Sequence, residues 1–287
     1  MTINNEKSKN GSPEPWGNNV LVEFENGIAW VSMNRPEKKN AINVALAKEM
    51  VEVIDALEVD SRCGVMVLTG SGDSFSAGMD LKDYFQATDD LPDIERNRVY
   101  RINGAWQWRR LLHYPKPTIA MVNGWCFGGA FTPLVACDLA IAAEEAMFGL
   151  SEINWGIMPA GVVSKAVATM MNQRDGLYYA MTGESFNGVK AASMGLVNEA
   201  VPRERLRERT RQLAMKLLEK NPTALRMTKI GFKVSSEMSW EQASEYLLAK
   251  IDQMQSVDPE RGRAQAMKQF LEDKTYRPGL GAYQREQ

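Results

Sequence analysis

The chain has 287 residues, of which 44% are hydrophobic and 24% charged, and its formal net charge is -2. This composition is typical of a globular protein with one large domain, or with a core and a smaller appendage. A net charge so close to zero creates no broad positive potential that would attract a polyanion, so no nucleic-acid partner is expected. The three cysteines show no CxxC spacing, which favours a reducing compartment and predicts a cytoplasmic location.

The N-terminal segment and one long apolar stretch lack the patterns of export and membrane signals. Residues 1–19 are polar and rich in Asn, Ser and Pro, which predicts a flexible tail and excludes a secretory signal. Residues 117–143 are long enough to span a membrane, but glycines, a proline and polar residues interrupt them. These interruptions favour a buried strand, a turn and a short helix, so no membrane partner is expected.

Apolar periodicity predicts the elements that follow. Residues 20–24 and 28–33 alternate around Asn26-Gly27, which predicts a β-hairpin. Apolar residues over 46–57 share one helical face. Buried strands are predicted for three short apolar runs, at residues 64–69, 118–122 and 139–142. Strands that alternate with helices indicate an α/β fold with a largely buried sheet.

Two structured parts are predicted after the tail. Residues 20–201 would form the α/β core. Residues 202–287 are charged, carry apolar stripes at helical spacing and contain no good strand candidate. They are therefore predicted to form a helical C-terminal region.

Two glycine-bearing turns could hold an oxyanion. The segments are Ser76-Ala77-Gly78-Met79-Asp80-Leu81 and Cys126-Phe127-Gly128-Gly129-Ala130. Each follows a predicted strand and opens a helix, where backbone N–H groups are unpaired and feel the positive end of the helix dipole. Two such groups could converge on a thioester oxygen and stabilise an enolate. The alternative is a pair of ordinary strand-to-helix turns.

The single histidine limits the remaining chemistry. His113 is alone, so metal sites built on two or three histidines are excluded and no metal is expected. A Ser-His-Asp triad has no GxSxG elbow to support it. The glycine patterns of dinucleotide and P-loop sites are also absent. Catalysis would have to use carboxylates, hydroxyl groups and backbone amides.

Several segments follow one another in an order that is typical of one family. They are Asn34-Arg35-Pro36, Asn40-Ala41, Ser76-Ala77-Gly78-Met79-Asp80, Asn123-Gly124, Gly128-Gly129-Ala130 and Phe148-Gly149-Leu150-Ser151-Glu152. From about residue 18 to the C-terminus the chain resembles the crotonase (enoyl-CoA hydratase/isomerase) superfamily. The resemblance implies a spiral of ββα units and a helical C-terminal region that forms trimers, usually paired into hexamers.

The same resemblance implies an acyl-CoA thioester as substrate. Coenzyme A would be part of the substrate, and no separate cofactor is expected. The oxyanion donors would be the N–H groups of Met79 and Gly129, with the adenine near Lys38 to Ala41 and Ala77. The full set of implied CoA contacts is Lys38, Ala41, Ala77, Met79, Asp80, Leu81, Trp125 and Gly129.

Longer segments narrow the match to one branch of the family. They are residues 79–85, 106–108, 123–129, 133–138 and 151–156. Nearly the whole chain resembles the hydroxycinnamoyl-CoA (feruloyl-CoA) hydratase-lyases. Family hydratases carry two glutamates, at the positions of Thr132 and Glu152. Thr132 therefore argues against a fatty-acid hydratase, whereas the lyases have a small hydroxyl residue there and keep the one glutamate.

The resemblance implies a reaction of phenylpropanoid catabolism. Water would add across an aryl enoyl-CoA, and a retro-aldol step would then give an aromatic aldehyde such as vanillin and acetyl-CoA. Glu152 would be the catalytic carboxylate and Tyr84 would hold the 4-hydroxyl group of the ring. The alternatives are that Glu152 is only a charge near a helix start and that Tyr84 is only a partly buried helix residue.

Two departures from the lyase pattern concern the acyl pocket. Leu248 stands where the family has a second phenol-binding tyrosine from a neighbouring subunit, and Tyr246 lies about 200° away around the helix. Met158 replaces a rigid proline. The implied substrate-binding set is Tyr84, Thr132, Trp155, Met158, Tyr246 and Leu248. These two residues make the pocket more apolar, and a buried phenol left without a hydrogen-bond partner costs about 1–3 kcal/mol. A substrate whose ring lacks a free 4-hydroxyl group therefore remains an alternative.

Three other functions remain as alternatives. The first is another crotonase activity, either a hydratase that releases the β-hydroxyacyl-CoA or an isomerase that uses one carboxylate. The second is a trimeric binding protein with a dead site, against which the intact Glu152 and both turns argue. The third is RNA binding, which the acidic balance disfavours.

Overall fold

The computed structural model describes residues 14–277, 279 and 281–285. Two units are present: Met1–Tyr114 with Thr118–Arg211, and Pro115–Pro117 with Gln212–Gln287. Of the predicted tail, residues 1–13 lie outside the described residues. Glu14–Pro15 form strand β1, which pairs with the next strand of the first unit.

The predicted hairpin is present at the edge of the large sheet. Strand β2 (Val20–Glu25) pairs antiparallel with β3 (Ile28–Met33). Asn26 and Gly27 both have positive φ, 47° and 85°, which a tight two-residue hairpin turn requires and which Asn and Gly tolerate best. The Asn-Gly signal in the sequence is therefore confirmed.

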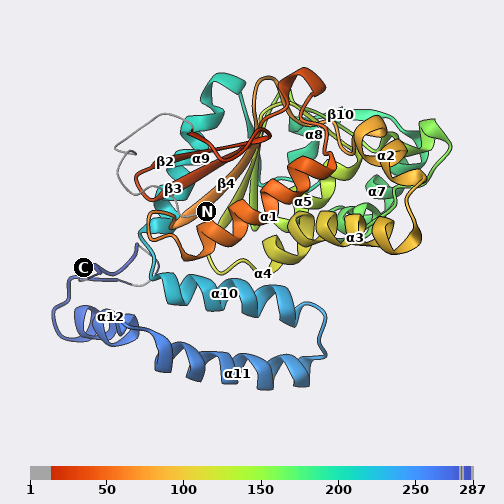
Figure 1. Cartoon of the computed structure of the whole chain (residues 1–287). Helices are drawn as coiled ribbons and strands as arrows, with labels where there is room; N and C mark the ends of the chain where they lie inside the picture. Colours follow the sequence, from red (N-terminus) through yellow and green to blue (C-terminus); the bar gives the residue numbers. More distant parts are fainter. Residues whose placement is uncertain (1–13, 278, 280, 286–287) are drawn as a thin grey trace. The chain divides into compact units, whose positions relative to one another are not determined.

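The large sheet has seven strands in the order β1-β2-β3-β4-β6-β8-β11 (Figure 1). The strands after the hairpin are β4 (Val65–Gly70), β6 (Thr118–Val122), β8 (Leu139–Ala143) and β11 (Glu199–Val201). From β3 onward all neighbours are parallel. Every residue of β4 and β6 is buried, which explains their continuous apolar runs. The predicted strands and the α/β fold class are confirmed.

A smaller sheet lies in the same unit, in the order β10-β9-β7-β5. Its strands are β5 (Ser74–Ser76), β7 (Trp125–Phe127), β9 (Met147–Gly149) and β10 (Ser185–Asn187). Strands β5, β7 and β9 are parallel neighbours. Parallel strands end at the same edge of a sheet, so the segments that follow these three strands emerge side by side.

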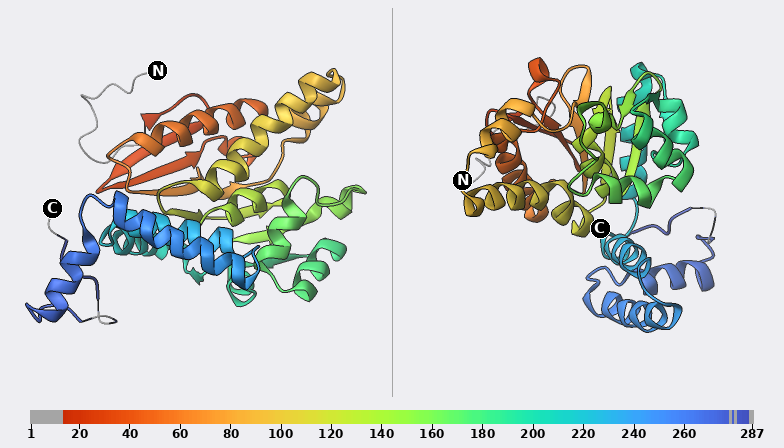
Figure 2. Two further views of the ribbon diagram at one scale, coloured as in Figure 1. Left: turned by 90° about the horizontal axis from the view of Figure 1, so that it is seen from below. Right: turned by 90° about the vertical axis from the view of Figure 1, so that its right-hand side faces the viewer.

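Helices surround the two sheets of the first unit. The longer ones are α1 (Val44–Val59), α3 (Asp93–Gly104), α6 (Val163–Met170) and α7 (Gln173–Thr182). The shorter ones are η1 (Pro36–Lys38), η2 (Leu81–Gln86), α2 (Ala87–Asp89), η3 (Ala105–Arg110), α4 (Leu111–His113), η4 (Gly128–Ala130), α5 (Phe131–Ala136), η5 (Ser151–Trp155) and α8 (Gly188–Ser193). Asn43 caps α1 by accepting from the amide of Leu46, and α1 packs beside α3 (Figure 2).

The C-terminal part is helical, as predicted. Helix α9 (Arg203–Leu218) ends in the second unit, which also contains α10 (Pro222–Ser235), α11 (Trp240–Val257) and α12 (Gly262–Leu271). Helices α10 and α11 run alongside each other (Figure 1). A Cβ added at Gly231 would lie 3.0 Å from Leu247 Cδ2, so glycine permits this close helix contact.

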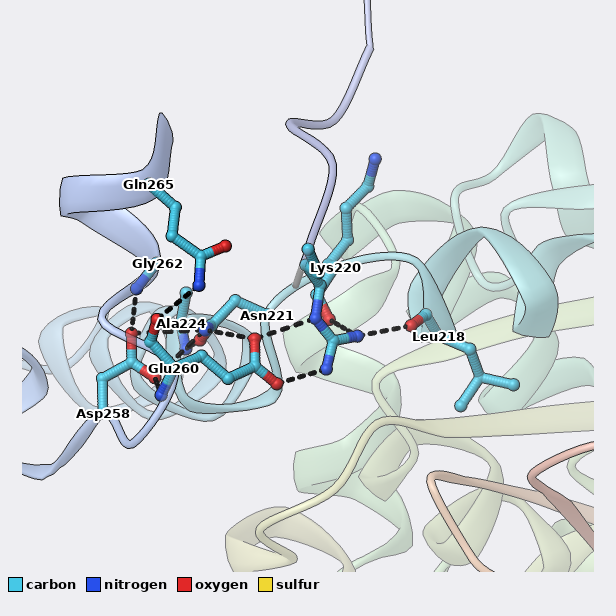
Figure 3. A network of polar contacts seen from close by, with 9 residues as sticks. Leu218, Lys220, Asn221, Ala224, Asp258, Glu260, Gly262 and Gln265 are labelled. Atoms are coloured by element: carbon cyan, nitrogen blue, oxygen red, sulfur yellow. Dashed lines mark hydrogen bonds and ion pairs between the residues drawn. The ribbon is translucent and has the colours of Figure 1, made fainter. Parts of the chain in front are cut away.

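A polar network ties the ends of the second unit's helices together (Figure 3). Asn221 caps α10 by accepting from Ala224 N at 2.8 Å, and its amide donates to Asp258 and to Glu260 Oε2. Arg285 donates to Glu260 Oε2 at 2.9 Å, to the carbonyl of Leu218 at the end of α9 and to the carbonyl of Lys220. These bonds fasten the end of the chain to the α9–α10 and α11–α12 turns.

Within the part of the chain that the structure describes, no helix combines the length and the apolar character needed to cross a membrane.

Candidate active site

The first glycine-bearing turn follows β5 and is fixed by its neighbours. Ser76 Oγ donates to the carbonyl of Asn40 at 2.8 Å and accepts from Gly78 N at 3.1 Å. Ile42 N donates to the carbonyl of Gly78, and Asp80 N donates to the carbonyl of Ile42. These bonds leave the N–H of Met79 without an acceptor among the described residues. It is therefore free to receive a ligand atom.

The second turn follows β7. Gly128 has a φ of +50°, a left-handed conformation that glycine adopts without a steric penalty. The turn leads through η4 into α5. Gly129 N makes no hydrogen bond to a described residue. This is the second free N–H group that the sequence predicts.

The two turns lie against each other. A Cβ built on Gly78 would lie 2.5 Å from Phe127 O and 3.1 Å from Gly129 N. A Cβ built on Gly129 would lie 3.5 Å from Met79 N. The free N–H groups of Met79 and Gly129 therefore belong to one site, where they can act together on one oxygen atom.

Glu152 lies beside these turns. It follows β9 at the start of η5, and a Cβ built on Gly128 would be 3.0 Å from Glu152 Oε1. Its Oε2 atom is buried and has no hydrogen-bond partner among the described residues. Burial raises the pKa of Glu152, and its own backbone opposes the shift only in part. A desolvated carboxyl group with a raised pKa, next to paired N–H donors, is suited to accept and return a proton.

We expect Glu152→Gln to be more stable than the wild type at pH 7. Because burial raises the pKa of this carboxyl group, the folded protein holds its proton more tightly than the unfolded chain does. The ionised group therefore removes stability as the pH rises above the ordinary carboxyl range. Glutamine avoids this cost at every pH.

The thermal midpoints of both proteins, measured from pH 7 down to about pH 4, test this prediction. The advantage of the variant should shrink toward acid pH as Glu152 takes up its proton. An equal or lower midpoint for the variant at pH 7 would contradict it.

The residues predicted to contact the acyl group have different environments. Tyr84 on η2 is 3% exposed and Thr132 on α5 is also 3% exposed. Burial raises the pKa of Tyr84 to about 12, so its hydroxyl group keeps its proton at neutral pH. Trp155 and Met158 are 65% and 66% exposed. The predicted roles of these four residues in substrate binding stay predictions.

Tyr246 and Leu248 lie on α11 in the second unit. Leu248 is 58% exposed, whereas the Tyr246 ring is half-buried under the ammonium group of Lys250. Their predicted contribution to the acyl pocket stays a prediction.

The predicted CoA contacts lie on two segments that are bonded together. Ala77 N donates to the carbonyl of Lys39, and Ala41 N donates to that of Lys38. Lys38 is exposed on η1, and the side chains of Leu81 and Trp125 are 51% and 48% exposed. The structure thus joins the 38–41 and 77–81 segments, and their contact with CoA stays a prediction.

Asp80 takes part in a buried ion pair that the sequence did not indicate. Arg35 donates to the Asp80 carboxylate at 2.9 Å, to Asp83 at 3.1 Å and to the carbonyl of Ala41 at 2.5 Å. Burial favours the neutral form of Asp80, but the Asp83 amide and Arg35 outweigh it and lower the pKa of Asp80. Asp80 also accepts from the first amides of η2. Arg35 therefore holds the 38–41 and 77–81 segments to each other.

We expect Arg35→Met to lower the free energy of unfolding by about 3 kcal/mol at pH 7, because Asp80 is left buried without its cation. Urea unfolding measures this loss. The loss should shrink as the pH falls through the lowered pKa of Asp80, since the neutral acid no longer needs a cation. The matched control is Arg96→Met, which breaks an exposed pair with Asp93 and should cost at most about 1 kcal/mol. Equal losses for the two variants would contradict the role of Arg35.

Asn40 is a second residue that the sequence analysis missed. It is fully buried, with a φ of +56°. Its carboxamide accepts from Arg35 N and donates to the carbonyls of Ser71 and Ser74. The sequence indicates the Asn40-Ala41 dipeptide only as part of the family pattern. Its physical role is to hold three backbone segments together beside the first turn.

Two free N–H groups and a half-buried carboxyl group gather at one edge of the smaller sheet, an arrangement suited to an enzyme that acts on acyl thioesters. The chain belongs to the enoyl-CoA hydratase/isomerase family, whose model matches residues 23–277.

Two curated relatives and one solved structure illustrate the range of the family. The chain is 58% identical, over 93% of its own length and 96% of the relative's, to the hydroxycinnamoyl-CoA hydratase-lyase of Pseudomonas fluorescens. It is 31% identical to the 2,3-dehydroadipyl-CoA hydratase of Escherichia coli K12, over 77% of this chain and 84% of the relative. The crystal structure of an enoyl-CoA hydratase subunit from Geobacillus kaustophilus HTA426 matches with a TM-score of 0.80 and 28% identity, covering 89% of this chain and 95% of that one. The predicted crotonase fold is confirmed.

Proposed function

We propose that the protein hydrates an aryl-substituted enoyl-CoA and cleaves the resulting β-hydroxyacyl-CoA to an aromatic aldehyde and acetyl-CoA. The observation that carries this proposal is the single carboxylate of the site. Glu152 lies beside the paired N–H groups, and the position of the second family glutamate is held by the buried Thr132. The similarity to a hydroxycinnamoyl-CoA hydratase-lyase over nearly the whole chain supports the same reaction.

The hydration step uses the carboxylate as a base. Glu152 removes a proton from water, and the hydroxide oxygen bonds to Cβ of the enoyl group. The electron pair of the double bond moves toward the thioester oxygen, where the N–H groups of Met79 and Gly129 stabilise the enolate. Glu152 then returns the proton to Cα, which completes the β-hydroxyacyl-CoA.

The cleavage step uses the same carboxylate and the same two N–H groups. Glu152 removes the proton of the β-hydroxyl group, the new C=O bond forms, and the Cα–Cβ bond breaks. Its electron pair becomes an enolate of acetyl-CoA on the same two N–H groups. Protonation of that enolate by Glu152 gives acetyl-CoA and resets the carboxylate.

The ring end of the substrate is assigned to Tyr84. Its buried phenol, which burial keeps protonated, can form a hydrogen bond with an oxygen on the ring. A feruloyl-CoA-like thioester is therefore the proposed substrate, with a vanillin-like aldehyde as product. The cytoplasmic location and the lack of a separate cofactor, both predicted from the sequence, belong to this proposal.

We also propose a homotrimer, or a homohexamer built from two trimers, as the working assembly. Support comes from α11, where Trp240, Leu248 and Ile251 expose 91%, 58% and 50% of their surfaces. Exposed apolar residues gathered on one helix are typical of an interaction surface. Light scattering of the purified protein tests the assembly, and a monomeric mass would contradict it.

Product analysis with feruloyl-CoA tests the proposed reaction. The wild-type protein should release vanillin and acetyl-CoA in equal amounts. Accumulation of the hydrated thioester without aldehyde would mean a hydratase that stops at the first step. Untouched feruloyl-CoA, together with turnover of an aliphatic enoyl-CoA, would assign the chain to another activity of the family.

A further inference from the structure

Two amide side chains surround the thioether of Met79. Gln107 Nε2 lies 3.6 Å and Asn103 Nδ2 lies 3.7 Å from Met79 Sδ. Asn103 Nδ2 also donates to Gln107 Oε1 at 3.2 Å. Gln107 is 5% exposed. Because Met79 supplies one of the two free N–H groups, this amide pair borders the reacting end of the site.

The same asparagine borders the predicted ring end. Asn103 lies one turn after Tyr100 on α3, so the two residues share a helix face. The Tyr100 ring stacks on Tyr84, with ring centroids 6.2 Å apart. Burial is the largest cause that raises the pKa of Tyr84, and the Asn103 amide, acting as a donor toward the phenol oxygen, lowers it. Asn103 therefore links the oxyanion residue to the ring-binding tyrosine.

The oxygen of this carboxamide has no partner. Asn103 Oδ1 is buried and accepts no hydrogen bond from a described residue. Its nitrogen is engaged by Met79 and Gln107, which fixes the orientation of the amide. A buried acceptor without a donor is uncommon in a folded protein and calls for an explanation. An acceptor held in this way is available to a donor that the substrate brings.

The local backbone is also unusual. Tyr84 lies on η2 and Gln107 on η3, and both segments are π-helical turns. Such turns are rare and occur frequently at functional sites. Two of them border the same cluster of Met79, Asn103 and Tyr84.

We propose that Asn103 is a specificity-determining residue whose Oδ1 accepts a hydrogen bond at the ring end of the site. The donor is a free hydroxyl group on the aryl ring. The inference rests on the proposed function. An aryl ether has no proton to donate, so it leaves Oδ1 unpaired. Asn103 thereby favours the free phenol over the ether.

Unreactive thioesters test the inference without turnover. The probes are the CoA esters of 3-(4-hydroxyphenyl)propanoate and 3-(4-methoxyphenyl)propanoate, whose saturated chains cannot be hydrated. Titration calorimetry should show that the wild type binds the hydroxy ester more tightly than the methoxy ester. Asn103→Leu, which is close in size but has no acceptor, should reduce this preference about tenfold. An unchanged preference in Asn103→Leu would overturn the inference.

Two controls separate specificity from damage. Butanoyl-CoA, which has no ring, should bind wild type and variant equally, so a loss of its affinity would assign Asn103 a general structural role instead. Asn97→Leu makes the same replacement at an exposed position of the same helix and should keep the preference. If Asn103→Leu does not fold, Asn103→Ala is expected to show the same tenfold loss, and retained preference there counts against the inference. Failure of the proposed function would show separately, as feruloyl-CoA left uncleaved by the wild type.

Discussion

Replacement of Glu152 by glutamine is expected to lower kcat with feruloyl-CoA by roughly a thousandfold. Glutamine has nearly the same shape, but it cannot take a proton from water or from the β-hydroxyl group. The carboxyl group lies beside Gly128, and its buried Oε2 atom has no hydrogen-bond partner within the described parts of the chain. The Asp80 carboxylate next to Met79 is paired with Arg35 and has a lowered pKa, so it is a poor substitute for Glu152 as a base.

The measurement is a steady-state assay of aldehyde release. Binding of a saturated aryl-propanoyl-CoA should stay within a few-fold of the wild-type affinity, because the N–H groups are unchanged. The matched control is Glu95→Gln, an exposed glutamate on α3, which should leave kcat unaltered. A Glu152→Gln enzyme that retains a tenth or more of wild-type kcat would show that the base is another group.

Gly78→Ala is expected to lower kcat by about a hundredfold or more through the oxyanion donors. The added methyl group would lie 2.5 Å from Phe127 O and 3.1 Å from Gly129 N. It must therefore push the two turns apart, and the N–H groups of Met79 and Gly129 lose their common focus. The φ of +87° at Gly78 adds strain for any L-residue.

Gly195→Ala separates the backbone strain at positive φ from the displacement of the two turns. Gly195 has a φ of +79°, yet its nearest atom would lie 3.5 Å from an added methyl group, which is ordinary contact. This control should lose stability by a similar strain but keep its kcat. Thermal midpoints and kcat measured on both variants distinguish a loss of stability from a loss of the oxyanion site. Equal kcat values for Gly78→Ala and wild type would mean that the turns do not form the oxyanion site.

The hairpin and the central strands could be predicted because their signals are local. Asn26-Gly27 supplies two residues that tolerate positive φ, and the wholly buried β4 and β6 leave continuous apolar runs. The strands β5, β7 and β9 have three residues each, which is too short for a periodicity to appear. Their parallel pairing, which brings the three functional segments to one edge, depends on contacts far apart in the sequence.

The candidate site was predictable to a similar extent. The sequence pointed to two free N–H groups because glycine-bearing turns before helices have a physical signature. The catalytic role of Glu152 was implied only by the family resemblance, and its position against Gly128 is visible only in the structure. The sequence shows Arg35 only as part of the family pattern and gives no signal for Asn103, because a buried ion pair and an unpaired amide oxygen arise only once distant segments have packed.

The claim that one carboxylate serves both steps has a direct test in the hydrated intermediate. The CoA ester of 3-hydroxy-3-(4-hydroxy-3-methoxyphenyl)propanoate, made by synthesis, is given to wild type and to Glu152→Gln, and vanillin and acetyl-CoA are quantified. The wild type is expected to cleave it to equal amounts of both products, and the variant is expected to leave it intact. Cleavage by the variant at a near wild-type rate would contradict the account, since a group other than Glu152 would then drive the retro-aldol step.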